Sequence, residues 1–167
     1  MNVLPRLEQL SPKKLVGKRA RMSFAANTTV DLWKSFMPRR KEVANAAGPE
    51  LYSVEVYPPH FFSPFDPAAA FEKWAGVAVA EGAAVPEGME ALDLPAGLYA
   101  VFVYQGTDAA AADFYRYIFT GWLPSSGYEL DDRPHFALMG AKYKRESPDS
   151  EEEIWIPVRG LGPEAVP

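Results

Sequence analysis

The chain has 167 residues, a formal net charge of −5 and a hydrophobic content of 48%. This size and apolar content suit one domain, or two fused half-domains with a shared core, and they exclude intrinsic disorder. The acidic balance argues against a nucleic-acid interface, which needs clustered Lys and Arg, and the lack of Cys excludes disulfides and thiol catalysis. Because neither a signal peptide nor an apolar run of membrane-spanning length is present, we expect a cytoplasmic protein with no membrane contact.

Hydrophobic periodicity predicts eight regular elements. The expected strands cover residues 14–24, 51–57, 71–79, 98–105, 135–143 and 152–158, and the expected helices cover residues 29–46 and 108–123. Corresponding elements of the two halves lie about 80 residues apart, a spacing typical of a duplicated supersecondary unit rather than a solenoid repeat. The last two strands of each half are expected to pair as antiparallel neighbours.

This order of elements predicts an α+β fold made by tandem duplication of a βαββ unit. The two units are expected at about residues 10–80 and 96–158, around a pseudo-twofold axis, in one domain of residues 1–167. Both helices should cover one face of an antiparallel sheet, with a central ligand groove. Residues 80–97, rich in Gly and Pro, should connect the units, and the tail 159–167 should be flexible.

Three motifs of the second half carry a resemblance to a known family. They are PAGLYAVFVYQG at 95–106, WLPSSGYELDDRPHF at 122–136 and PDSEEEIWIPV at 148–158. In this order they resemble the signature of GyrI-like small-molecule-binding domains, the effector-binding domain of AraC-type and multidrug-sensing regulators. The resemblance covers the whole chain and is strongest over residues 86–158. It implies a tandem of two βαββ modules around a ligand groove.

The resemblance also implies a function, the binding of a bulky amphipathic or aromatic small molecule that is often a cation. Because the effector module occupies the whole chain, we expect a stand-alone sensor or sequestering protein without direct nucleic-acid contact. Two alternatives remain: a hydrolase of cyclopropanoid electrophiles, and a protein-interaction module that modulates a partner such as gyrase. No cofactor and no metal is expected, since neither of the two His residues has a ligand partner at fixed spacing.

Aromatic residues of the strands are the expected walls of the groove. Strand alternation assigns Ile154 and Ile156 to the helix-packed face and points Trp155 toward the groove, with Trp74 similarly placed in the first half. Such a cage would stack on a flat or cationic ligand, and the alternative for each residue is packing in the core. The predicted ligand-binding residues are Trp74, Tyr104, Phe136, Trp155, Glu55 and Phe102.

One carboxylate is expected to determine whether the site prefers cationic over neutral ligands. The resemblance implies a Glu directly after the Phe of the RPxF motif, but this chain has Ala137 there. This departure predicts little preference for cationic over neutral ligands. Glu55, a charged residue in an otherwise apolar strand, is the candidate replacement, and the candidate catalytic group if the protein is an enzyme. The alternative is that Glu55 is an exposed residue of an edge strand.

Overall fold

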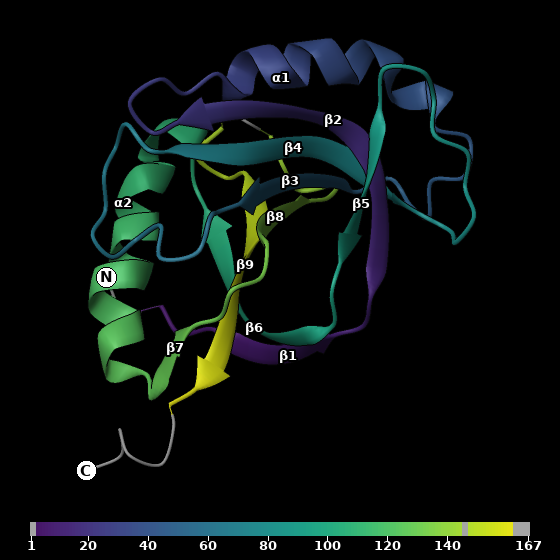
Figure 1. Ribbon diagram of the computed structural model, residues 1–167. Coiled ribbons are helices and arrows are strands. Elements are labelled where there is room, and N and C mark those ends of the chain that lie inside the picture. Colours follow the sequence, from purple (N-terminus) through teal and green to yellow (C-terminus); the bar gives the residue numbers. More distant parts are fainter. Residues whose placement is uncertain (1–2, 145–146, 162–167) are drawn as a thin grey trace.

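The computed structural model describes residues 3–144 and 147–161. It contains two α-helices and one antiparallel sheet (Figure 1), so the predicted α+β class is confirmed. The strands are β1 (Arg6–Leu10), β2 (Lys13–Ser23), β3 (Leu51–Val56), β4 (Ala70–Val79), β5 (Glu90–Leu94), β6 (Gly97–Gln105), β7 (Tyr128–Leu130), β8 (His135–Met139) and β9 (Glu151–Gly160), and the helices are α1 (Thr29–Phe36) and α2 (Ala111–Tyr117). In the part of the chain that is described, no helix has the length and apolar character needed to cross a membrane.

Both α-helices are shorter than the periodicity predicts, and each continues as turns of another kind. The 3₁₀ segment η1 (Met37–Glu42) follows α1 and carries Pro38, whose ring lacks the N–H that a continuing α-helix needs. The 3₁₀ turn η2 (Asp108–Ala110) precedes α2. The π-helical turn η3 (Ile118–Trp122) and the 3₁₀ turn η4 (Leu123–Ser125) follow it. The predicted helix 29–46 is therefore correct from residue 29 to residue 42 and wrong for residues 43–46, and the predicted helix 108–123 is helical throughout but of three kinds.

The strands lie in the order β1-β6-β9-β8-β3-β4-β2-β5, with β7 paired to β9 beside this path. The three strands of the first half and the three of the second meet where β3 pairs with β8. β1, β5 and β7 were not predicted from the sequence, because they are three to five residues long and carry few buried side chains. β5 lies within residues 80–97, the predicted connection, and pairs with β2.

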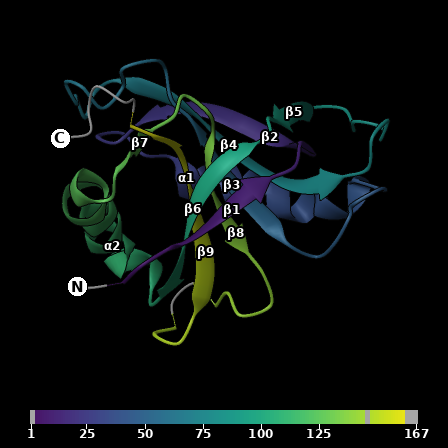
Figure 2. The ribbon, with the colours of Figure 1, turned by 90° about the horizontal axis from the view of Figure 1, so that it is seen from below.

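Both helices cover the same face of the sheet (Figures 1 and 2). α1 buries Phe36 against side chains of β2 and β4. α2 buries Phe114, and the following η3 turn buries Ile118, against β6 and β9. The sheet curls strongly, and its other face encloses a separate core that includes Tyr99 and Trp155. Burial of apolar area on both faces explains why the central strands are rich in large apolar residues.

The predicted flexible tail begins inside the sheet. β9 extends to Gly160, so residues 159 and 160 pair with β7 in a regular ladder. Residues 162–167 lie outside the described residues.

Candidate ligand-binding site

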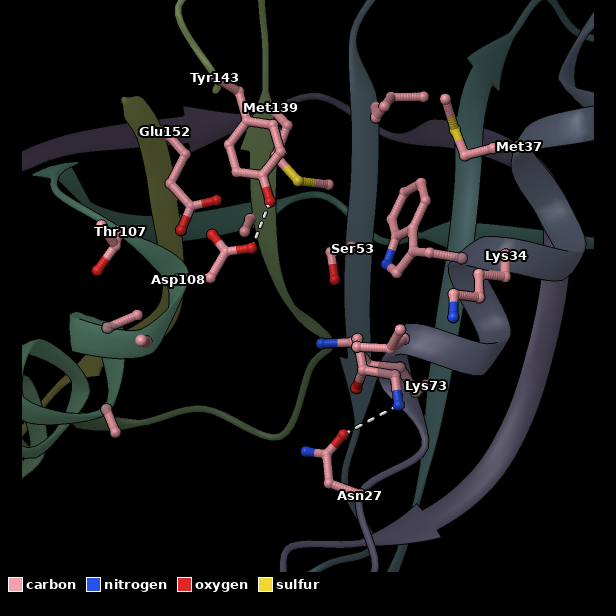
Figure 3. A pocket seen from close by; sticks show the side chains of 18 of the residues that line it. Asn27, Lys34, Met37, Ser53, Lys73, Thr107, Asp108, Met139, Tyr143 and Glu152 are labelled. Atoms are coloured by element: carbon pink, nitrogen blue, oxygen red, sulfur yellow. Dashed lines mark hydrogen bonds between the residues drawn. The ribbon is translucent and has the colours of Figure 1, made fainter. Parts of the chain in front are cut away.

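A cavity of about 1100 Å³ lies between the two helices, on the face of the sheet that the helices cover (Figure 3). β3, β4, β8 and β9 supply its floor, α1 supplies one wall, and η2 with α2 supplies the opposite wall. The helices stand apart here, because they pack on strand pairs at opposite ends of the sheet order. Between the two helices, neither helix covers the sheet, and the strand residues there have small side chains.

The floor of the cavity is built from small side chains at the β3–β8 junction. Ser53 and Ala137 are direct partners in this ladder, and both line the cavity. Leu51 and Met139 form the next pair along the same two strands and close the floor with apolar surface. Large residues at these positions would fill the space, so the small pair Ser53–Ala137 gives the cavity its depth.

The wall from α1 is apolar and aromatic. Trp33 and Met37 stand one helical turn apart and both line the cavity, with Val30 one turn before Trp33. Val30 and Met37 are 46% and 41% exposed, although large apolar side chains normally become buried. Lys34 is the polar member of this wall (Figure 3). Solvent-exposed apolar groups that face a cavity are typical of a ligand-binding surface.

The opposite wall is more polar. It contains Thr107 and Asp108 at the start of η2, Tyr115 on α2, and Tyr143 after β8. The Tyr143 hydroxyl donates a hydrogen bond of 2.7 Å to the Asp108 carboxylate (Figure 3). The Tyr104 hydroxyl donates a 2.6 Å bond to the Thr107 carbonyl and so holds the turn that carries Asp108.

Glu152 of β9 places a carboxyl group in the cavity (Figure 3). The pKa of Glu152 is raised to about 7, mainly by burial and also by the negative charges of Asp108 and Glu55, while the charge of Lys73 opposes this rise. The same acidic surroundings act on Tyr115, whose pKa burial raises well above its ordinary value. A carboxyl with a pKa near neutrality responds to both pH and ligand charge.

Glu55 lies two residues beyond Ser53 on the same face of β3 and is paired with the cavity residue Lys73. Its carboxylate accepts a 3.0 Å hydrogen bond from Lys73 Nζ, and both side chains are largely buried. Burial raises the pKa of Glu55, although the Lys73 charge opposes this effect. His135 is its partner across the β3–β8 ladder, and burial lowers the pKa of that imidazole to about 3, so His135 is neutral. Glu55 is buried at the centre of the sheet and is not an exposed residue of an edge strand.

The structure places three predicted site residues on the other face of the sheet. Trp74, Phe136 and Trp155 belong to the core that the curled sheet encloses, and none of them lines the cavity. Phe136 stacks on Trp155 with ring centroids 5.1 Å apart. The sequence predicts a groove on the face opposite the helices. In the structure, the cavity lies on the same face of the sheet as both helices.

The other two predicted aromatics share the cavity's face but lie beneath α2. Phe102 is fully buried, with its ring 5.2 Å from that of Trp122 and 6.1 Å from that of Phe114. Tyr104 is 5.0 Å from the Phe114 ring. Of these two, only Tyr104 is connected to the cavity, through its hydrogen bond to the η2 turn.

Several cavity residues were not singled out from the sequence. They are Trp33, Lys34, Lys73, Asp108, Tyr115 and Glu152. A signal for some of them exists in strand alternation: Glu152 shares a face with Ile154 and Ile156, and Lys73 shares a face with Ala75 and Val77. A charged side chain within an apolar strand face marks the place where the helices leave that face open.

Comparison with protein families identifies a match over nearly the whole chain. The model of the GyrI-like small molecule binding domain matches residues 5–159. Among curated proteins, the transcriptional regulator BrlR of Pseudomonas aeruginosa is 29% identical over 159 residues. The match covers 94% of this chain and 56% of BrlR, so the chain spans little more than half the length of that relative.

Solved structures share the fold at lower identity. The structure of SAV2435 bound to tetraphenylphosphonium matches with a TM-score of 0.73 and 17% identity, and the match covers 94% of each chain. The EcmrR C-terminal domain matches with a TM-score of 0.70 and 16% identity, over 96% of this chain and 100% of that domain. At these identities the likeness concerns the fold.

Proposed function

We propose a function that starts from the family of this chain, which belongs to the GyrI-like small molecule binding domains. The cavity between α1 and α2 binds a bulky aromatic or amphipathic molecule. In this function the protein senses or sequesters its ligand. The ligand would lie on the Ser53–Ala137 floor with Trp33 against one side and Tyr115 against the other. This set of contacts replaces the aromatic cage predicted from the sequence around Trp155.

One observation carries the proposal: a cavity of about 1100 Å³ with exposed apolar side chains on the α1 wall and polar groups on the opposite wall. Pockets for drug-sized molecules commonly measure about 300–1,000 Å³ and have apolar linings with a few placed polar groups. The volume therefore suits a ligand with several rings. SAV2435, which shares the fold, binds a molecule of this kind, tetraphenylphosphonium, and we extend that chemistry to this chain as part of the proposal.

The duplicated architecture is part of the same proposal. The elements β2-α1-β3-β4 and β6-α2-β8-β9 follow one order along the chain, and the two halves meet at the β3–β8 ladder. Each half then contributes one helix to a wall and two strands to the floor. A site of this kind arises between two copies of one unit, at the place where neither helix covers the sheet.

Titration with tetraphenylphosphonium, followed by calorimetry, tests the proposal. The unmodified protein should bind it saturably at one site. Ala137→Leu, which adds bulk to the floor, should weaken binding roughly tenfold or more. Val103→Leu is the matched control, because Val103 is 45% exposed on the other face of β6. Absence of saturable binding, or equal loss in both variants, would contradict the proposal.

Hydrolysis is a second candidate, favoured by Glu152. A carboxyl with a pKa of about 7 inside a ligand cavity is suited to general acid or base catalysis. Glu55, the catalytic candidate from the sequence, is held in an ion pair with Lys73 and does not line the cavity. Incubation with a cyclopropanoid electrophile, followed by mass spectrometry, separates the two functions. Turnover that Glu152→Gln abolishes would establish the enzyme, and intact ligand would support binding alone.

A further inference from the structure

Charges of opposite sign occupy the two sides of the cavity (Figure 3). Asp108 and Glu152 lie on the side formed by η2 and β9, and Lys34 and Lys73 lie on the side formed by α1 and β4. The floor between them carries the uncharged Ser53 and other small or apolar side chains. The cavity is therefore not simply acidic, although the net charge of the chain is negative.

The two charged sides lie on strands that are not neighbours, although the charge of Lys73 still lowers the pKa of Glu152. Glu152 is on β9 and Lys73 is on β4, and β8 and β3 lie between these strands. Three strand spacings correspond to about 14 Å between the backbones. This separation is comparable with the length of a ligand that has several fused or linked rings, so one molecule could reach both sides.

The basic side keeps hydrogen-bonding capacity that the protein does not use up. Lys73 donates one bond to Glu55, but an ammonium group has three donors, and Lys73 also lines the cavity. Lys34 is an exposed residue of the α1 wall and adds a second positive charge on the same side. A ligand with a positive charge alone would leave this side facing apolar surface or another cation.

We infer that the cavity selects an aromatic ligand that carries a cationic group at one end and an anionic group, such as a carboxylate, at the other. The cation faces Asp108 and Glu152, and the anion faces Lys34 and Lys73. The inference rests on the proposed function, since it names the ligand class for the same cavity. It also gives Lys34 a role in specificity that an exposed helix lysine otherwise lacks.

Two dyes that differ in one group test this inference. Rhodamine B carries a delocalised cation and a free carboxylate, and its ethyl ester carries the cation alone. Fluorescence anisotropy at about pH 8, above the pKa of Glu152 of about 7, compares the two dyes with Glu152 ionised. We expect the free acid to bind about three- to fivefold more tightly than the ester, the scale of one partly exposed ion pair.

Variants assign the preference to the basic side. Lys34→Met should abolish the preference for the free acid, because it removes a positive charge that the dye carboxylate would face. Lys41→Met is the matched control, because Lys41 lies on η1 and does not line the cavity, and it should keep the preference. The double change Lys73→Met with Glu55→Gln removes the second cation without leaving a buried charge unpaired, and should lower the preference as well.

The outcomes separate the inference from the function it rests on. If neither dye binds, the proposed function fails. If both bind and the ester binds as tightly as the free acid or more tightly, the function stands and the inference is overturned. A preference for the free acid that persists in Lys34→Met and in the double variant would also overturn it.

Discussion

Phe136 and Trp155 stack with their ring planes 18° apart, on the face of the sheet turned away from the cavity. The Tyr99 ring lies 5.7 Å from Trp155 and completes an aromatic cluster inside the curled sheet. Both stacked residues are buried, Phe136 to 2% exposure and Trp155 to 7%. The cluster therefore contributes to stability, and its ligand-binding role predicted from the sequence has a direct test.

Trp155→Ala should destabilise the protein without weakening ligand binding. Loss of a buried Trp costs about 3–5 kcal/mol of unfolding free energy, measurable by urea denaturation. Trp33→Ala should do the reverse, because Trp33 is half-buried at the cavity wall: affinity for tetraphenylphosphonium should fall by about 1–3 kcal/mol with a smaller loss of stability. Weaker binding by folded Trp155→Ala, with unchanged binding by Trp33→Ala, would move the site to the other face.

Ala137→Glu should shift the binding preference toward cationic ligands. Residue 137 lies on the cavity floor opposite Ser53, so a carboxylate there would face a bound ligand. We expect a gain of about 1 kcal/mol for a cationic dye relative to a neutral analogue of similar shape. Ala137→Gln is the control, since it adds the same bulk without charge. An equal change for both dyes in both variants would show that only volume matters at this position.

Glu152→Gln should remove a pH dependence of cation binding. Because burial raises the pKa of Glu152 to about 7, the carboxyl ionises near neutrality, and cation affinity should rise between about pH 6 and pH 8. The variant should show a flat profile with weaker cation binding at the high-pH end. Glu55→Gln is the comparison, because Glu55 is already bound to Lys73. Loss of the profile in Glu55→Gln alone would assign the role to Glu55.

The same residue should affect stability with the opposite dependence on pH. The folded-state pKa of about 7 exceeds the ordinary value of 4.5, so the folded protein binds this proton more tightly than the unfolded chain. The resulting stabilisation is complete below about pH 4 and is lost as pH rises through about 7. Glu152→Gln should therefore become more stable than the unmodified protein at about pH 8, by about 1–3 kcal/mol. A difference in urea midpoint between Glu152→Gln and the unmodified protein that does not change with pH would contradict this prediction.

Gly97→Ala should destabilise the protein through Arg133. A Cβ at residue 97 would overlap the Arg133 guanidinium, which donates a 2.7 Å hydrogen bond to the Leu98 carbonyl and lies 4.8 Å from the Tyr99 ring centroid. Displacing it should cost about 1–3 kcal/mol. In an Arg133→Ala background the same change should cost much less.

A second glycine provides the control for that experiment. Gly140→Ala should have almost no effect, because a Cβ at residue 140 meets no described atom within 4 Å. Additive costs of Gly97→Ala and Arg133→Ala would show that the two residues are not coupled. In that case, the contact of Arg133 with β6 would not account for the cost of Gly97→Ala.

Local sequence determined much of the fold. The alternating apolar strands at 51–57 and 98–105 appear as β3 and β6 within one residue at each end, because both faces of these strands are buried. Pro38 lies two residues after the end of α1, where its missing N–H cannot support a further α-helical turn. The motifs of the second half identified the family, which the match over residues 5–159 confirms.

Only the tertiary structure decided which face of the sheet holds the cavity. Strand alternation places Trp155 on one face of β9 and Ile154 and Glu152 on the other. The same alternation would be found whichever of these two faces holds the cavity. That choice depends on the curl of the sheet, which closes one face around Trp155, and on the spacing of α1 and α2, which leaves Glu152 uncovered on the other. The curl of the sheet and the spacing of the helices depend on contacts between residues far apart in the chain, so the local sequence pattern does not predict them.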